Sequence, residues 1–97
     1  MNFSLFEALE EVAKEVERAS VKFPTWPSDP LHALSVLGEE FGELTKETVQ
    51  LIYEPSKTSR GCVRIEAVQT AAMAIRFLMS IDKYEMKPGY QHDQSKP

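Results

Sequence analysis

The residues best suited to chemistry in this chain are glutamates placed at helical spacing. Glu39, Glu40 and Glu43 form the pattern E-E-x-x-E, and Glu47 follows four residues later. Side chains three, four and seven residues apart share one face of a helix, so Glu40, Glu43 and Glu47 form a strip of carboxylates. Like charges at these spacings repel one another, and a bound cation would turn that repulsion into attraction. The pattern predicts either a metal site or a solvated acidic face.

A second pair of polar residues precedes the longest apolar stretch of the chain. Glu66 and Gln69 form E-x-x-Q, again on one face of a helix. If the helices that carry the two patterns pack antiparallel, four oxygen-bearing side chains meet at one point. Oxygen ligands without thiolates suit Mg²⁺ or Mn²⁺ rather than zinc. The alternative is a charged rim around a helical bundle, in which Glu66 pairs with Arg60, Arg64 or Arg76.

Apolar periodicity predicts an all-α chain with three main helices and no strand. The expected helices cover about residues 2–20, then Pro30 or Leu31 to Tyr53, and then Cys62 to Asp82 or Glu85. Prolines 24, 27 and 30 keep the segment between the first two helices extended. Asp29 is the expected N-cap of the second helix, with Pro30 in its first turn.

The apolar residues of each helix indicate which face is buried. In the first helix the expected stripe is Phe3, Phe6, Leu9, Ala13 and Val16. In the second it is Leu34, Leu37, Phe41, Leu44, Thr48 and Leu51. Residues 67–79 of the third helix are apolar nearly all round, so this helix needs covering on every side. Three helices alone would struggle to bury all of these apolar side chains, and we expect a second copy of the chain to pack against them.

Composition bounds what else the chain can be. Its 97 residues suffice for one domain, expected over residues 1–86, followed by a polar tail over residues 87–97. A net charge of −4 argues against a nucleic-acid binder, and 42% hydrophobic residues argue against a disordered chain. One cysteine excludes an internal disulfide framework and a cysteine-based zinc site. No apolar run approaches the roughly 20 residues that span a bilayer, so we expect a cytoplasmic protein without a membrane partner.

Residues 32–44, HALSVLGEEFGEL, resemble the first motif of the MazG-like, all-α nucleoside triphosphate pyrophosphohydrolases. The signature of that family is E-E-x-x-E on one helix and E-x-x-D on the next. Glu66 to Gln69, followed by TAAMA, stands where the second motif belongs, and the resemblance covers about residues 24–81. It implies a helical bundle completed as a homodimer or homotetramer. It also implies Mg²⁺-dependent cleavage of a nucleoside triphosphate to the monophosphate and pyrophosphate, for example in the removal of non-standard nucleotides.

The resemblance also implies roles for individual residues. Glu40, Glu43, Glu66 and Gln69 take the positions of metal ligands. Glu39 takes the position of a catalytic base for the attacking water, of an outer-sphere group, or of a ligand to an additional ion. The expected substrate contacts are Lys57, Arg60 and Arg76 at the phosphates, and Trp26 and His32 at the base or sugar. Lys57 and Arg60 are otherwise residues of a solvated turn, and Arg76 is expected to touch phosphate only if it lines the pocket. Trp26, between two prolines, is otherwise a hydrophobic anchor, and His32 is otherwise an ordinary residue near a helix start.

Gln69 is the one departure from the family pattern. It offers a neutral amide oxygen where the family usually has aspartate, so the site loses a negative charge and should bind Mg²⁺ more weakly. This leaves three interpretations of the chain: an active pyrophosphohydrolase, a nucleotide-binding module with weakened catalysis, and a helical assembly protein without a ligand.

Overall fold

A computed structural model describes residues 3–86 of the chain. It contains three α-helices and a short 3₁₀-helix: α1 (Leu5–Lys22), α2 (Pro30–Tyr53), α3 (Arg60–Met79) and η1 (Ile81–Lys83). These residues include no strand, which confirms the predicted all-α class. The expected tail over residues 87–97 and the expected helix start at Asn2 lie outside the described residues.

Capping residues set where α1 and α2 begin. The Ser4 hydroxyl accepts a hydrogen bond from the Glu7 backbone N–H at 3.1 Å, and the Glu7 carboxylate accepts one from the Ser4 N–H at 3.0 Å. This capping box satisfies two N–H groups that a helix start leaves unpaired, so α1 begins at Leu5. Asp29 caps α2 as predicted, because its carboxylate accepts from the Leu31 N–H at 2.8 Å.

The ends of α3 differ from the prediction at both termini. The Ser59 hydroxyl accepts a hydrogen bond from the Cys62 N–H at 3.2 Å, so the helix begins at Arg60, two residues earlier than expected. It ends at Met79, before the expected end at Asp82 or Glu85. The Ser80 N–H bonds to the Phe77 carbonyl at 3.3 Å, three residues back, and the chain continues as the tighter 3₁₀-helix η1.

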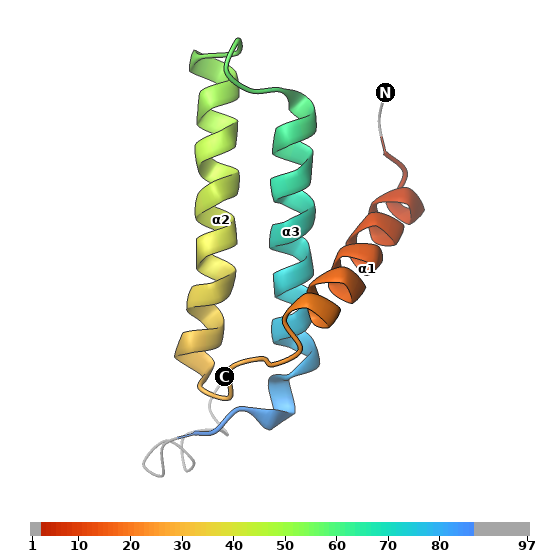
Figure 1. Cartoon of the computed structure of the whole chain (residues 1–97), viewed down its shortest axis with the longest axis vertical. Coiled ribbons are helices and arrows are strands. Elements are labelled where there is room, and N and C mark those ends of the chain that lie inside the picture. Colours follow the sequence, from red (N-terminus) through yellow and green to blue (C-terminus); the bar gives the residue numbers. More distant parts are fainter. Residues whose placement is uncertain (1–2, 87–97) are drawn as a thin grey trace, which may run out of the picture.

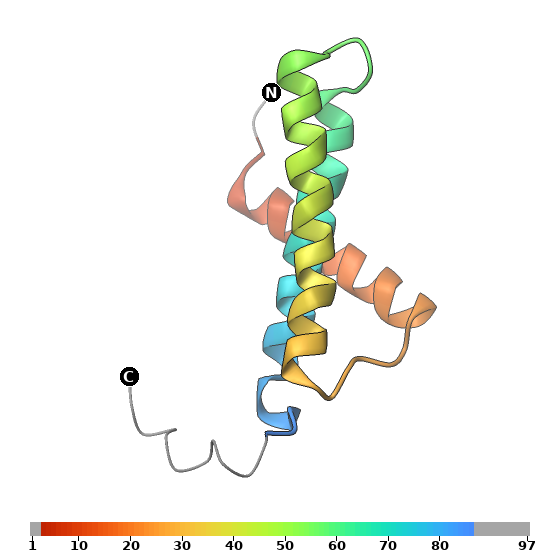
Figure 2. The ribbon, with the colours of Figure 1, turned by 90° about the vertical axis from the view of Figure 1, so that its left-hand side faces the viewer.

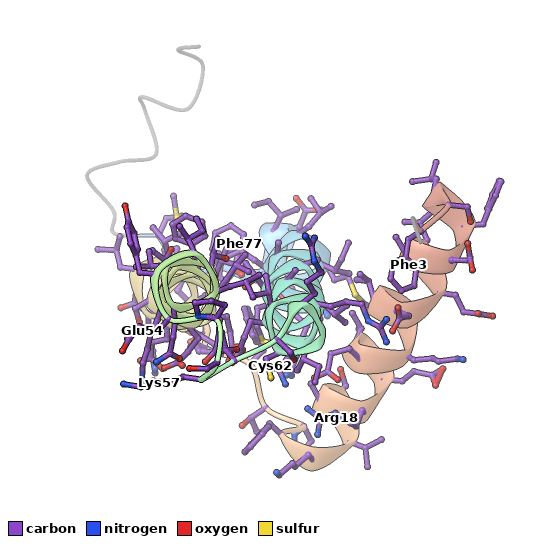
Figure 3. All side chains as sticks on the ribbon, turned by 90° about the horizontal axis from the view of Figure 1, so that it is seen from above. Phe3, Arg18, Glu54, Lys57, Cys62 and Phe77 are labelled. Carbon is purple, nitrogen blue, oxygen red and sulfur yellow. The ribbon has the colours of Figure 1, made fainter. Side chains whose placement is uncertain are left out.

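The three helices form a hairpin with one helix laid across it. α2 and α3 run antiparallel along most of their length, joined by the turn over residues 54–59 (Figure 1). α1 packs against α3, crosses the hairpin obliquely (Figure 2) and does not pack against α2. Viewed along the hairpin, α1 lies beyond α3, so none of the helices of residues 3–86 covers the side of α2 that faces away from α3 (Figure 3).

The buried core is small and consists of short side chains. The buried hydrophobic residues within the described part are Ala19, Ala33, Ala72 and Met73. Residues that pack partly buried around this centre are Val12, Val16, Trp26, Val36 and Leu37. No large side chain of residues 3–86 is fully buried. One copy of the chain therefore shields few of its large apolar side chains from water.

The predicted buried stripe of α2 is wrong in part. Leu34 is 51% exposed and Phe41 is 60% exposed. The side that packs on α3 instead carries Ala33, Leu37 and Glu40, with further half-buried positions towards the hairpin turn. Helical periodicity marks two apolar sides on α2, and α3 occupies the one that contains Glu40. In the predicted stripe of the first helix, likewise, Phe3, Phe6, Leu9 and Ala13 are exposed rather than buried. Within residues 3–86, no helix combines the length and apolarity needed to cross a membrane.

Candidate functional site

A pocket of about 530 Å³ opens where the end of α1, the extended segment after it and the middle of the hairpin meet. Its lining includes five residues that were predicted to contact metal or substrate: Trp26, His32, Glu40, Gln69 and Arg76. They are brought together because α2 and α3 are antiparallel and because the prolines carry residues 23–29 across the end of the hairpin.

Arg76 and Trp26 form one wall of this pocket. The Arg76 guanidinium lies over the Trp26 ring, with its central carbon 4.8 Å from the ring centroid. Its Nη2 also donates a hydrogen bond to the Phe23 carbonyl at 2.8 Å. Arg76 is only 8% exposed, so it is the buried charged residue of the described part of the chain. Trp26 packs against the core, as the anchor interpretation predicted, and it also lines the pocket.

Tyr84, just after η1, holds Trp26 in place. The Trp26 indole N–H donates a hydrogen bond to the Tyr84 hydroxyl at 2.9 Å, and that hydroxyl donates to the Phe77 carbonyl at 3.1 Å. The Tyr84 ring also packs on Phe77, with 5.0 Å between the ring centroids. Tyr84 was not predicted as a site residue, because no local pattern relates it to a tryptophan 58 positions earlier.

The carboxylates of the two motifs act on one another electrostatically. Burial raises the pKa of Glu40 above its ordinary value, and nearby negative charges raise it further, in the order Glu66, Glu43, Glu15 and Glu39. Glu66 lies on the facing helix, so this effect joins the first motif to the second across the α2–α3 interface.

Glu66 is perturbed in the same direction. Burial raises its pKa, followed by the charges of Glu43 and Glu47. Glu43 thus acts on both of the other carboxylates, and we call Glu40, Glu43 and Glu66 the carboxylate cluster. Glu47, next along α2, accepts a hydrogen bond from the Thr58 hydroxyl in the hairpin turn.

The carboxylate cluster has no cation beside it within the described part of the chain. The ion pairs found there involve none of its three residues. Arg64 lies 3.8 Å from a carboxylate oxygen of Glu11 on α1, and Arg76 bonds to a backbone carbonyl. The ion pairs that the charged-rim interpretation required for Glu66 are therefore not formed.

The carboxylate oxygens of the cluster are the kind of ligand that Mg²⁺ prefers, but the side chains as they stand do not enclose an ion. Among residues 3–86, no three His, Cys, Asp or Glu side chains come close enough together to hold a metal. Gln69, which lines the pocket next to Glu40, adds an amide oxygen of the same hard character.

A second, smaller pocket of about 300 Å³ adjoins the first and lies between α1 and α3. Glu15, Arg18 and Gln69 line both pockets. Lys14 and Arg64 also line the second one, and so does Glu11, so its lining mixes cations with carboxylates. The sequence analysis missed these residues of α1, although Glu15 lies at helical spacing among the core-facing residues of that helix.

Glu15 and Arg18 are already paired. The Arg18 Nε donates a hydrogen bond to the Glu15 carboxylate at 2.8 Å, and a second bond from the same guanidinium makes the pair bidentate. Lys57 and Arg60, which were predicted to touch phosphates, lie elsewhere. Lys57 pairs with Glu54 at the hairpin turn, on the far side of the hairpin from Arg18 (Figure 3). Neither Lys57 nor Arg60 lines either of these two pockets.

No family model, curated protein or solved structure matches this chain.

Proposed function

We propose that this chain is a Mg²⁺-dependent nucleoside triphosphate pyrophosphohydrolase of the MazG-like kind. The proposal rests on the carboxylate cluster: Glu40 and Glu66 lie on facing helices, burial and neighbouring carboxylates raise the pKa of each, and neither forms an ion pair among residues 3–86. One member of the cluster, Glu40, lines a pocket large enough for a nucleoside, whereas Glu43 and Glu66 do not line it. The motifs that carry the cluster resemble those of the family.

The metal ligands in this proposal are Glu40, Glu43 and Glu66, with the amide oxygen of Gln69 as the fourth group. Mn²⁺ is an alternative ion, because it takes the same oxygen ligands. When bound, the ion neutralises phosphate oxygens and orients the α-phosphorus for in-line attack by water.

Glu39 is the proposed catalytic base for that water. It precedes Glu40 on α2, and its side chain is exposed. Its negative charge reaches the cluster, since it contributes to the raised pKa of Glu40. A carboxylate in this position can accept the proton that the water loses as the new P–O bond forms.

The two adjoining pockets suit the two ends of a nucleotide. The larger one is walled by Trp26 and neighbouring apolar residues, which suit a base and a sugar. The smaller one is lined by Lys14, Arg18 and Arg64 together with Glu11 and Glu15. Its three cations now pair with Glu10, Glu15 and Glu11, and in this proposal they exchange those partners for the β- and γ-phosphates. Gln69 stands at the boundary between the two pockets, beside the cluster that would face the α-phosphate.

Pyrophosphate release from a panel of NTPs and dNTPs, with Mg²⁺ or Mn²⁺, tests the proposal. The informative variant is Glu43→Gln, and Glu17→Gln on the exposed side of α1 is the matched control. Changes beside a metal ligand cost about 10- to 100-fold, so loss of a ligand should cost more than about 100-fold while the control stays active. Equal activity of the two variants, or no release from any nucleotide, would contradict the proposal.

Metal binding has a readout that does not depend on activity. Mg²⁺ should raise the melting temperature of the native chain and of Glu17→Gln, and raise that of Glu43→Gln much less, because only a ligand of the folded state shifts unfolding. Gln69→Asp restores the usual carboxylate and should bind Mg²⁺ more tightly. If the native chain is inactive and Gln69→Asp is active, the binding-module interpretation is the better one.

We also propose that a second copy of the chain covers α2. Leu31, Leu34, Phe41, Val49 and Ile52 are all about half exposed or more, and we call this group the outer face of α2. Helical spacing puts these residues on one side of α2, turned away from the side that packs on α3. With so small a core, one copy buries little apolar area, and a symmetric pairing of outer faces would bury the same residues twice.

A further inference from the structure

Arg76 is a buried cation whose hydrogen-bonding capacity is mostly unused. The described part of the chain forms no ion pair with it and gives its side chain one hydrogen-bond partner, the Phe23 carbonyl. A guanidinium carries five N–H bonds, so four remain. No buried side-chain nitrogen of these residues is both sealed from solvent and unpaired. The Nε and Nη1 atoms of Arg76, which have no partner among these residues, are therefore open to solvent, and Arg76 lines the pocket.

The position of this guanidinium is fixed in advance. It lies over the Trp26 ring and is tied to the Phe23 carbonyl. Trp26 is in turn held by its hydrogen bond to Tyr84. Because the planar guanidinium is held in this way, it loses little conformational freedom when a ligand binds. This favours recognition of a ligand that presents matching hydrogen-bond acceptors along one edge.

Arg76 lies at the end of the pocket away from the carboxylate cluster. It follows Gln69 by seven residues of α3, about 10 Å along the helix axis. His32, which also lines the pocket, precedes Glu40 by eight residues of α2. If the phosphates lie at the cluster and at the cations of the smaller pocket, the group that reaches Arg76 is the base. Arg76 is then not needed as a phosphate contact, the role that the family resemblance implied for it.

We propose that Arg76 recognises the base of the substrate and selects a base that has two adjacent hydrogen-bond acceptors on one edge. This inference rests on the proposed nucleotide function. Guanine offers N7 and O6, and cytosine offers N3 and O2. Adenine places an amino donor beside each exposed ring acceptor, and uracil and thymine place an N–H donor between their two carbonyls. The substrate class is therefore cytosine and guanine nucleotides.

Base analogues test this on the native protein without any mutation. The pairs are dCTP against dUTP, and dGTP against 7-deaza-dGTP, which keeps O6 and has a carbon in place of N7. A bidentate arginine contact should favour dCTP, dGTP or both over the matched analogue by about 5- to 160-fold in kcat/KM. The pair that discriminates identifies which of the two bases the pocket takes. Equal kcat/KM within both pairs would overturn the proposal.

Binding of the monophosphates separates this inference from the proposed reaction, because a monophosphate has no pyrophosphate to release. Calorimetric titration with dCMP, dUMP, dGMP and dAMP should give the same preference for cytosine or guanine. If hydrolysis is absent and the binding preference is present, the reaction fails and the inference stands. If hydrolysis occurs without a base preference in either assay, the reaction stands and the inference fails.

Substitution of Arg76 supplies the direct test. Arg76→Lys keeps the charge and Arg76→Gln keeps a donor for the Phe23 carbonyl, and neither presents the planar fork. The preference between paired bases should fall to within about twofold of unity in both variants. An equal loss of kcat/KM for every base, with the preference intact, would place Arg76 at the phosphates and overturn the inference. If circular dichroism shows that both variants are unfolded, the analogue pairs on the native protein decide the question.

Discussion

Replacement of Phe41 by glutamine tests whether the outer face of α2 is an interface between two copies of the chain. Phe41 lies near the middle of that face and is 60% exposed in one copy. Glutamine keeps the length and the helix propensity of the position while removing the apolar ring. The folding of a single copy should change little, because so much of this side chain already faces water.

The exposed fraction sets the expected size of the effect. Full burial of a phenylalanine side chain is worth about 1.5–3 kcal/mol, so covering the exposed 60% contributes about 1–2 kcal/mol per copy. A symmetric pair contains the residue twice, which gives about 2–4 kcal/mol for the pair. The dissociation constant of the dimer should therefore rise by about 30- to 900-fold.

Sedimentation velocity over a dilution series measures that dissociation constant directly. Lys46→Gln is the matched control, because Lys46 is exposed on the same helix and does not belong to the outer face. The control should dissociate at the concentration at which the native chain does. A native chain that is monomeric at every concentration, or a Phe41→Gln dimer as tight as the native one, would refute the reasoning.

Three further predictions follow from individual contacts. Tyr84→Phe removes the hydroxyl that accepts the hydrogen bond from the Trp26 indole N–H, and should lower the free energy of unfolding by about 1 kcal/mol. Circular dichroism should then show a melting temperature about 4–8 °C lower, and an unchanged melting temperature would contradict the role of that bond. The raised pKa of Glu40 means that the folded chain binds its proton more tightly than the unfolded chain, so this group makes stability fall as pH rises above 4.5 through the raised pKa. Glu40→Gln should therefore raise the melting temperature at pH 7 in metal-free buffer and flatten its pH dependence, and a lower melting temperature there would contradict the electrostatic argument. Met73, 8% exposed, lies in the centre of the core. Met73→Ala should lower the free energy of unfolding, measured by urea denaturation, by about 2–5 kcal/mol, and Met73→Leu should lower it by less than about 1.5 kcal/mol. Equal losses in the two variants would show that the surrounding side chains move into the space that alanine leaves.

Features that depend on residues near one another in the chain could be predicted before the fold was known. Three helices, the extended segment over residues 23–29 and the cap at Asp29 follow from prolines, capping side chains and apolar spacing. The grouping of Glu40 with Glu43 on one side of a helix is equally local, because 3.6 residues per turn bring positions three apart together. Trp26, His32 and Arg76 were also found by sequence reasoning, although nothing in their own neighbourhoods showed that they share one pocket.

The side of each helix that packs against another helix could not be predicted in this way. Periodicity marks apolar residues on two sides of α2, and nothing local distinguishes the side with Glu40 from the side with Phe41. The path of residues 23–29 across the hairpin brings Phe23 to Arg76, 53 residues later, and leaves the guanidinium buried beside the pocket. The oblique crossing of α1 likewise brings Arg18 into a site that its sequence position does not suggest. These contacts join residues far apart in the chain, so they depend on how whole helices pack, and short-range spacing carries no information about that packing.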